Sequence, residues 1–240
     1  MLTGRQKRIL EIVIKEYTRS AEPLGSEELL KQYDFGVSPA TIRAEMAELT
    51  HLGYLYQPHV SAGRVPTDKG YRFFVNDLMK SRSLPVGEQR MLQEEILKLK
   101  ARNIRLARTA AKLLATLSHN LAISGLIEEE EYFQSGIRSL LSNPEFSDVD
   151  EICRVVEVLD YLDENVDRIM SQLKEGEVQT LIGRENPLIK SDDCSMVVSR
   201  CRMPDGNTGI LAIIGPKRMR YAKNISLIEY MTRLLGRFNP

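Results

Sequence analysis

The sequence has few of the residues that build reactive, metal-binding or disulfide-linked sites. It contains three cysteines and three histidines among 240 residues. The cysteines lack the paired spacing of metal ligands, and their odd number is typical of reduced thiols in a cytosol. The histidines are scattered, without a helical pair or a companion nucleophile. We therefore expect no enzyme activity, no metal site and no cofactor.

The sequence also lacks long apolar runs and an excess of charge of either sign. No apolar run is long enough to span a membrane and no signal peptide is recognisable, which predicts a cytoplasmic protein. Lys and Arg together number 33, as do Asp and Glu. The balance hides a gradient, because residues 81–120 are basic, 121–180 acidic and 181–240 basic. The acidic stretch is most simply a solvated face, which is favoured over a partner site, and it could also repel DNA.

The most informative stretch is residues 37–49, which predict a short helix with two distinct faces. Ser38 can accept from the free N–H groups of the first turn, and Pro39 suits the first helical position. Apolar residues at helical spacing predict a buried stripe. They are Ile42, Met46, Leu49 and Leu52. The opposite face offers small or hydrogen-bonding side chains around one arginine, as a recognition helix needs to approach base edges. They are Ala40, Thr41, Arg43 and Ala44.

The elements around this helix predict a winged helix over residues 1–80. Thr3 and Gln6 form a capping-box pair, Ser26 is expected to cap a second helix, and Gly53 suits the end of the third. The predicted order is a helix over 4–19, a helix over 27–33, a turn over 34–37, the recognition helix, and strands 54–57 and 65–67 flanking the polar tip of a wing at 59–64.

A single capped amphipathic helix usually only packs into a core, so the ordered set of elements carries the prediction of DNA binding. Residues 1–80 hold nearly as many acids as bases, and the basic footprint is therefore local. Its members lie on the recognition helix, the wing and the start of the next helix. They are Arg43, His59, Arg64, Lys69 and Arg72. We expect modest affinity per protomer, which dimerisation would raise.

Several motifs follow one another in a characteristic order. In the N-terminal part they are Thr3-Gly4-Arg5-Gln6, Glu22-Pro23-Leu24-Gly25-Ser26, Val37-Ser38-Pro39-Ala40-Thr41-Ile42-Arg43, Gln57-Pro58-His59 and Ser61-Ala62-Gly63-Arg64-Val65-Pro66-Thr67-Asp68-Lys69-Gly70-Tyr71-Arg72-Phe73. Further motifs are Asn143-Pro144-Glu145-Phe146, Ile182-Gly183-Arg184-Glu185-Asn186-Pro187, Asp193-Cys194-Ser195 and Ile214-Gly215-Pro216-Lys217-Arg218-Met219-Arg220-Tyr221-Ala222. In order and spacing they are similar to the HrcA family of bacterial heat-inducible transcription repressors. The resemblance implies a repressor that binds an inverted-repeat operator of the CIRCE type ahead of chaperone genes and depends on the GroEL chaperonin.

The sequence departs from that family at two places. Ala44 stands where the family usually has asparagine, which leaves the operator preference open. The chain also passes directly from residues 121–126 through Glu128-Glu129-Glu130-Glu131 to Tyr132-Phe133. The resemblance therefore implies that the inserted dimerising domain of the family is absent and that the GAF-like domain that hosts it is reduced.

Residues 88–118 carry a heptad stripe of the kind found in coiled coils. Its members are Leu92, Ile96, Leu99, Asn103, Leu106, Ala110, Leu113 and Leu117. A lone asparagine at a seam position fixes register and strand number in some coiled coils. One interpretation is a dimer seam around Asn103, formed by Leu92, Ile96, Leu99, Asn103, Leu106 and Leu113. The other, equally weighted, is one long helix that packs along the sheet of its own domain.

The remaining residues predict a small α/β layer. The expected strands are 121–127, 132–136, 178–182, 195–202 and 209–214, and the expected helices are 149–173 and 223–237. Strands covered by helices on one side fit a GAF-like sheet. Gly215-Pro216-Lys217-Arg218 could cradle an anion, although a turn whose Arg218 and Arg220 pair with the acidic helix is favoured.

These inferences predict an α+β protein. It has a winged helix-turn-helix over 1–80, a linker or dimerisation helix over 81–120 and a reduced GAF-like domain over 121–240. The expected partners are double-stranded DNA, a second copy and, by resemblance, GroEL. Arg43 and Thr41 would read bases beside Ala40 and Ala44. The residues expected at the sugar–phosphate backbone or minor groove are Ser38, Lys69, His59, Ser61 and Arg64. Two alternatives remain: a regulator whose GAF-like domain senses a small molecule, and a chaperonin-dependent protein whose DNA binding has decayed.

Overall fold

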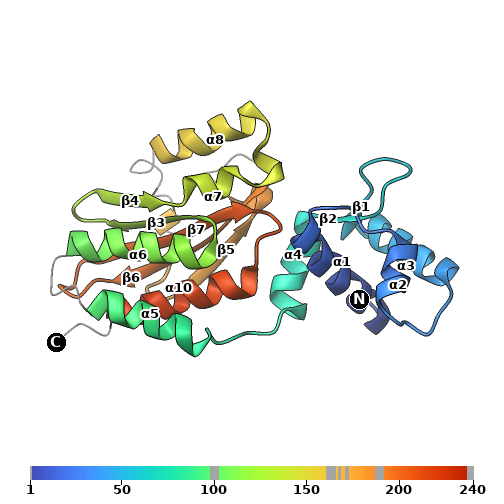
Figure 1. Ribbon diagram of the computed structural model, residues 1–240, viewed down its shortest axis with the longest axis horizontal. Coiled ribbons are helices and arrows are strands. Elements are labelled where there is room, and N and C mark those ends of the chain that lie inside the picture. The colour runs from blue at the N-terminus through green and yellow to red at the C-terminus, as the bar shows by residue number, and fades with distance from the viewer. Residues whose placement is uncertain are drawn as a thin grey trace. The chain divides into compact units, whose positions relative to one another are not determined.

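The computed structural model describes residues 2–97, 103–160, 166, 169–170, 173–186 and 192–236. The chain divides into two compact units, Met1–Lys80 and Ser81–Pro240. Figure 1 shows the chain coloured by residue number. Residues 81–120, which the sequence predicted as a separate segment, belong to the second unit.

The N-terminal unit has the predicted order of a winged helix. Its elements are α1 (Gly4–Ser20), α2 (Ser26–Gln32), α3 (Pro39–His51), β1 (Leu55–Tyr56), β2 (Val65–Pro66), α4 (Asp68–Phe73) and the π-helical turn η1 (Phe74–Leu78). Thr3 and Gln6 form the predicted capping box of α1. Ser26, in contrast, is the first residue of α2 and not its cap. The helix begins one residue earlier than predicted, and the N-cap position is Gly25, which has no side chain to cap the helix.

The third helix, α3, forms as its terminal signals predict. The Ser38 hydroxyl accepts from the Thr41 N–H, and Pro39 occupies the first turn. Ile42, Met46 and Leu49 are buried, whereas Leu52 is 37% exposed. The predicted stripe was one residue too long because the helix ends at His51 and Gly53 turns the chain with φ +76°.

The second unit is built on one five-stranded antiparallel sheet. Its strands are β3 (Leu121–Leu126), β4 (Glu131–Ser135), β5 (Val178–Ile182), β6 (Cys194–Arg202) and β7 (Thr208–Pro216). Their order in the sheet is β4-β3-β7-β6-β5. The two longest strands, β6 and β7, pair in register from Cys194↔Pro216 to Arg202↔Thr208. The predicted α+β class is thus confirmed.

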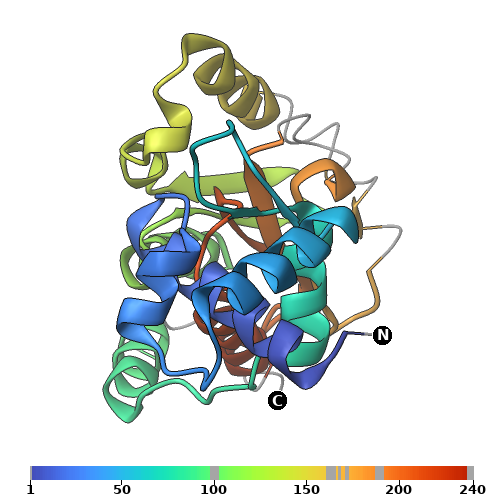
Figure 2. The same cartoon turned by 90° about the vertical axis from the view of Figure 1, so that its right-hand side faces the viewer.

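Helices cover this sheet on both faces, not on one as predicted. Figures 1 and 2 place α6 (Asn103–Ser118) and α10 (Tyr221–Gly236) on one side, with α5 (Val86–Leu97) packed on them. On the other side lie α7 (Ile137–Leu141), the 3₁₀ turn η2 (Pro144–Phe146) and α8 (Val149–Asp160). There Leu140, Phe146 and Val155 join the inward residues of the central strands in one apolar core. A further 3₁₀ turn, η3 (Gly183–Glu185), follows β5.

The heptad stripe is divided between two helices and is used inside the second unit. Leu117 is half-buried, and the other apolar residues of the stripe that the structure describes on α5 and α6 are buried within their own domain, which favours the second of the two interpretations. The buried residues include Leu92, Ile96, Leu106 and Leu113. Asn103 is the first residue of α6 and half-buried, and Leu99 lies outside the described residues. A stripe of this period serves a core as well as a coiled coil, and here α6 packs on β3 and β4.

Candidate nucleic-acid interface

The exposed face of α3 presents one cation among small side chains. Ala40, Arg43 and Ala44 are exposed, so the helix backbone is accessible on both sides of the arginine. The Arg43 guanidinium lies 3.8 Å from the carboxylate of Glu27 on α2, and the two side chains are 67% and 75% exposed. An exposed pair at this distance is weak and readily exchanged for another anion.

Ser38 and Thr41, two predicted DNA-contact residues, are hydrogen-bonded to each other at the start of α3. The Ser38 hydroxyl accepts from the Thr41 N–H at 3.2 Å and lies 2.9 Å from the Thr41 hydroxyl. This arrangement satisfies a free donor of the first turn and orients the Thr41 side chain along the helix start.

The wing is a short hairpin with an ordered tip. β1 and β2 pair antiparallel through Leu55↔Pro66 and Tyr56↔Val65, and the loop between them extends away from the helices in Figure 2. The Gln57 amide donates to the carbonyl oxygens of Val60 and Ala62, both at 2.8 Å. These bonds fix the turn that exposes the Val60 side chain, which is 97% accessible.

Within the tip, His59 and Ser61 form a polar pair. The His59 Nδ1 atom lies 3.1 Å from the Ser61 hydroxyl, and both residues are exposed. The pair therefore presents hydrogen-bonding groups to solvent, as predicted for residues that would touch a nucleic acid backbone.

Arg64 anchors the wing and does not extend from its tip. Its N–H and C=O exchange hydrogen bonds of 2.9 and 3.1 Å with the backbone of Leu24. Its Nε donates to the Thr50 hydroxyl at 3.0 Å. Gly63 allows this close approach, since a Cβ there would lie 2.3 Å from the carbonyl carbon of Leu24. Arg64 thus joins the wing, the segment before α2 and the end of α3.

The Lys69 side chain also contacts other residues of the N-terminal unit. Its ammonium donates to the Leu52 carbonyl oxygen at 2.7 Å and lies 4.5 Å from the centre of the Tyr54 ring. A cation at this place interacts favourably with the C-terminal end of α3. The sequence could not reveal this contact, because it joins residues brought together only by the turn at Gly53.

A groove of about 360 Å³ lies between the start of α2, α3 and the wing. Arg43, Ser61 and Arg64 line it together, while His59 and Lys69 do not. The groove also contains residues that the sequence analysis did not select. They are Leu24, Gly25, Ser26, Met46, Gln57, Val60, Ala62 and Gly63. Most of them lie in the turn before α2 or directly after the first wing strand, and this place in the sequence was the signal that could have identified them as groove residues.

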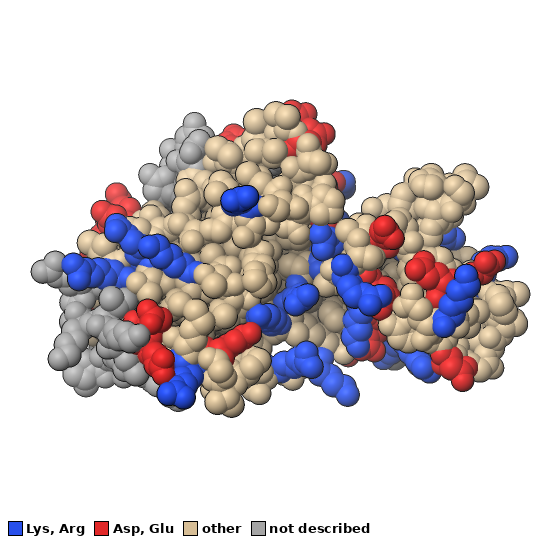
Figure 3. Space-filling model, viewed as in Figure 1, with Lys and Arg blue, Asp and Glu red and all other residues tan. Residues whose placement is uncertain are grey.

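Other cations of the unit hold its helices together. The Arg5 guanidinium bonds the Glu45 carboxylate at 2.5 Å. Arg8 lies 4.8 Å from the centre of the Phe35 ring and donates to the Asp34 carbonyl. Figure 3 accordingly shows charges of both signs interspersed on the visible face of the N-terminal unit. The cations that line the groove are Arg43 and Arg64.

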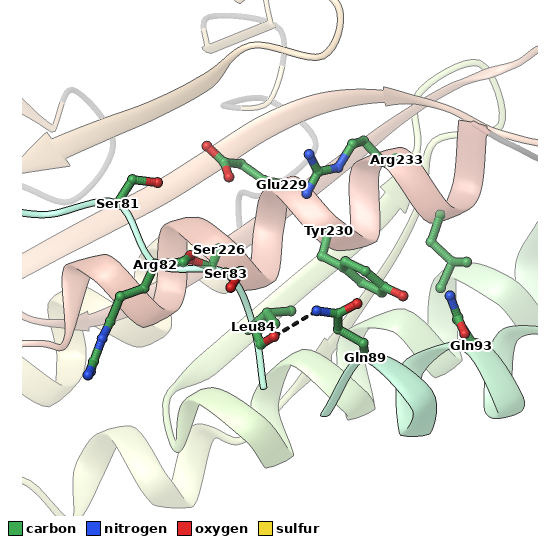
Figure 4. Close-up of a pocket in the computed structure, with 11 residues that line it drawn as sticks. Ser81, Arg82, Ser83, Leu84, Gln89, Gln93, Ser226, Glu229, Tyr230 and Arg233 are labelled. Atoms are coloured by element: carbon green, nitrogen blue, oxygen red, sulfur yellow. Dashed lines mark hydrogen bonds between the residues drawn. The ribbon is translucent and has the colours of Figure 1, made fainter. Parts of the chain in front are cut away.

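The second unit contains an open polar pocket of about 410 Å³, shown in Figure 4. Its walls come from residues 81–84, α5 and α10. The Ser226 hydroxyl donates to the Arg82 carbonyl at 2.5 Å, and the Gln89 amide donates to the Leu84 carbonyl at 2.7 Å. Glu229, Tyr230 and Arg233 of α10 complete the lining, with Ser81, Ser83, Gln93, Ser226 and Leu234.

The turn after β7 is held by an ion pair. Arg218 Nε lies 2.5 Å from the Glu145 carboxylate, and Nη2 donates to the Asn143 side chain at 3.1 Å. This supports the favoured interpretation of a structural turn, although the acid belongs to η2 and not to the acidic helix. Within the described ranges no cluster of side chains is suited to hold a metal ion. No helix described there is both long and apolar enough to cross a bilayer.

A helix-turn-helix followed by a wing, with an exposed arginine on its third helix, defines the class of winged-helix DNA-binding regulators. Residues 69–225 match the family described as HrcA protein C terminal domain. This chain belongs to the HrcA family.

Comparisons with individual proteins agree with that assignment. The chain is 27% identical to the heat-inducible transcription repressor HrcA of Natranaerobius thermophilus, over 98% of this chain and 96% of the relative. It is 26% identical to the repressor of the same name of Carboxydothermus hydrogenoformans, over 98% of each chain. These relatives confirm the predicted function at the level of the family, a transcription repressor and not an enzyme.

A solved structure shares the fold along the whole chain. It is titled "Crystal structure of a hypothetical protein at 2.2 A resolution", has a TM-score of 0.76 and 18% identity, and covers 100% of this chain and 99% of that one. The alignment with the Natranaerobius relative extends over 334 residues, whereas this chain has 240. The relative therefore has internal residues that this chain lacks, in agreement with the predicted shortened form.

Proposed function

We propose that this chain represses heat-shock genes by binding, as a dimer, to an inverted repeat of the CIRCE type. The observation that carries the proposal is the placement of Arg43. It projects from a capped helix, between small side chains, at the rim of a groove shared with the wing. Membership of the HrcA family supports the class of genes.

In the proposed complex, α3 enters the major groove. Ala40 and Ala44 allow the helix to approach the bases, and Arg43 donates to a base edge, with guanine the preferred partner of an arginine. Thr41, fixed by Ser38, supplies a second hydrogen bond near the helix start. Arg43 leaves Glu27 to make this contact, which costs little because that pair is exposed.

The wing would contact the sugar–phosphate backbone or the minor groove. His59 and Ser61 provide the polar groups, and Gln57 holds the tip in place. Arg64 and Lys69 would act on DNA only while remaining bound to Thr50 and Leu52. Their main role would be to hold the wing in position against α3.

A dimer with two-fold symmetry would impose the inverted repeat on the operator, because each copy reads one half-site. The proposal has two further parts. The protein acts in the cytoplasm, and, as the resemblance to the HrcA family implies, the GroEL chaperonin maintains its active form.

An electrophoretic shift assay with a CIRCE-type inverted repeat and a scrambled sequence tests the function. The wild-type chain should prefer the repeat. Arg43→Ala should lose about 1–3 kcal/mol on the repeat and little on scrambled DNA. Arg19→Ala, which removes an exposed arginine of α1 paired with Glu16, is the matched control. Equal binding of both sequences by the wild type would contradict the proposal.

A second function is favoured by the polar pocket of the second unit. Residues 81–84, which directly follow the winged helix, form part of its wall. A small polar ligand bound there would restrain this segment and so regulate DNA binding. A metabolite screen by thermal shift on the full chain would detect such a ligand, and Tyr230→Ala should abolish the shift. No shift with any metabolite, at concentrations near those of the cell, would count against a sensor.

A further inference from the structure

The most exposed of the large apolar side chains that the structure describes stands at the tip of the wing. Val60 is 97% exposed, whereas Val86 of α5 is 80% exposed and Val149 of α8 is 68% exposed. A single exposed apolar residue is common on a protein surface and by itself indicates nothing. The exposure of Val60 gains a meaning from its position, at the end of the element proposed to contact DNA.

The tip that carries Val60 has a fixed backbone. The Gln57 amide donates to the carbonyl oxygens of Val60 and Ala62, both at 2.8 Å. The Ala62 N–H donates to the His59 carbonyl oxygen at 2.9 Å and closes the turn. A β-branched side chain also has restricted rotation about χ1. Val60 is therefore held in a nearly constant position, and little conformational entropy is lost when it makes a contact.

The tip contains no side chain with a permanent charge. Residues 57–63 include no lysine, arginine, aspartate or glutamate, and His59 is the one titratable residue among them. In Figure 3 the lobe that projects where Figure 1 draws the loop between β1 and β2 is accordingly tan. A loop that served only to bind phosphates would be expected to carry lysine or arginine, which supply the affinity of such contacts. Small uncharged side chains are suited instead to approach the base pairs.

Val60 and Arg43 both line the groove of about 360 Å³ between α3 and the wing. In the proposed complex α3 occupies the major groove of the DNA, and one sugar–phosphate strand separates that groove from the adjacent minor groove. A strand running between α3 and the wing would have Arg43 on its major-groove side and Val60 on its minor-groove side. Ser61 and Arg64, which line the same space, would face the phosphates of this strand.

We infer that Val60 enters the minor groove beside each half-site and there selects A·T over G·C base pairs. Both kinds of pair present hydrogen-bond acceptors on the floor of the minor groove, and a G·C pair adds the guanine amino group, which is a donor. The methyl groups of Val60 cannot accept a hydrogen bond, so this donor would be buried without a partner. The assignment rests on the proposed function, because it requires α3 to lie in the major groove.

The minor groove suits a valine in size and in surface. The groove is about 6 Å wide in B-DNA, and the C–H groups of the sugars form its walls. A short branched side chain placed between these walls removes its apolar surface from water. Apolar side chains of other minor-groove proteins are used in the same groove as wedges. His59 and Ser61, whose side chains lie 3.1 Å apart, provide polar groups on either side of Val60.

Fluorescence anisotropy with a base analogue tests this selection. The probe is a CIRCE-type inverted repeat in which one base pair at a time, along a half-site and its flank, is A·T, G·C or inosine·cytosine. Inosine has the major-groove edge of guanine but lacks its minor-groove amino group. At the position under the wing, the wild-type chain should bind G·C about five-fold more weakly than A·T, the lower end of the cost of one mismatched pair. Inosine·cytosine should bind like A·T.

Two substitutions of Val60 separate this role from a simple backbone contact. Val60→Thr keeps the branched shape and adds a hydroxyl that can accept from the guanine amino group, so the preference should fall below about two-fold. Val60→Ile stays apolar and should keep the preference. Neither change should alter the salt dependence of binding, because valine releases no counterions. Val86→Thr makes the same change at another strongly exposed valine and should behave like the wild type.

Equal binding of G·C and inosine·cytosine by the wild type at every position would overturn the inference. It would also be overturned by a preference that survives Val60→Thr, or by a loss of affinity in Val60→Thr that is the same for all three pairs, as expected of a contact with phosphates or with a protein. The shift assay against scrambled DNA measures the proposed function separately. A chain that prefers the repeat but ignores the amino group retains the function without this contact. A chain that senses the amino group through Val60 but does not prefer the repeat retains the contact without the function.

Discussion

Arg43 on α3 lies 3.8 Å from Glu27 on α2, and both side chains are largely exposed. The arginine thus has a counter-ion of its own in the absence of DNA. A carboxylate beside a surface proposed to bind DNA also repels the phosphates of the DNA. Glu27 is therefore placed to lower the affinity for DNA of any sequence. A matching base edge would compete with Glu27 for the Arg43 guanidinium.

Glu27→Gln should raise affinity for operator and random DNA alike by about 1.4- to five-fold, because an exposed ion pair is worth about 0.2–1 kcal/mol. The gain should shrink as salt is added, since it is electrostatic. Fluorescence anisotropy titrations at two salt concentrations measure both effects. Glu28→Gln, which neutralises the neighbouring exposed glutamate of α2, is the control. Weaker operator binding by Glu27→Gln would show that the carboxylate positions Arg43.

Local signals predicted where α3 begins and ends, while contacts between residues distant in the sequence could not be predicted from it. Ser38, Pro39 and Gly53 act on their own neighbours, so their roles follow from the order of residues. Arg64 and Lys69 look like any basic residues of a wing, and only the folded chain brings them to Thr50 and Leu52.

The apolar stripe through Leu92 and Leu106 shows that the sequence also could not identify what a helix packs against. An apolar repeat fixes which side of a helix is buried but not what buries it. In the folded chain the partner is the helix's own domain. The second layer of helices on the sheet was missed because the expected helix over 149–173 gave no indication of which face it would cover.

Gly63→Ala should destabilise the N-terminal unit by about 1–3 kcal/mol, because the new methyl group would overlap the backbone of Leu24 and Gly25. The wing would separate from the segment before α2, and operator binding should fall with it. Urea unfolding followed by circular dichroism gives the change in free energy. Gly4→Ala, where no atom lies within 4 Å of the added Cβ, should be nearly neutral. A fully stable Gly63→Ala protein would mean that the wing does not pack on Leu24.

Arg64→Ala should lower stability by about 1 kcal/mol through loss of its hydrogen bond to Thr50. This differs from a simple phosphate contact, whose removal would change only DNA binding. Thr50→Ala removes the same bond from the other side and should have a similar effect. In a double-mutant cycle by urea unfolding, the combined variant should lose less than the sum of the two single losses. Strict additivity would show that the two side chains do not interact.

The three cysteines should differ sharply in reactivity. Cys153 is exposed on α8, whereas Cys194 and Cys201 are buried in β6. Burial raises the pKa of the Cys201 thiol to about 12, so almost none of the reactive thiolate is present at neutral pH. A disulfide reagent that reports released thiolate by absorbance should titrate one cysteine quickly in the native chain and all three in denaturant. Cys153→Ser should remove the fast phase, and Cys201→Ser should leave it intact. A fast phase that persists in Cys153→Ser would mean that β6 opens readily and that the sheet is far less stable than its packing implies.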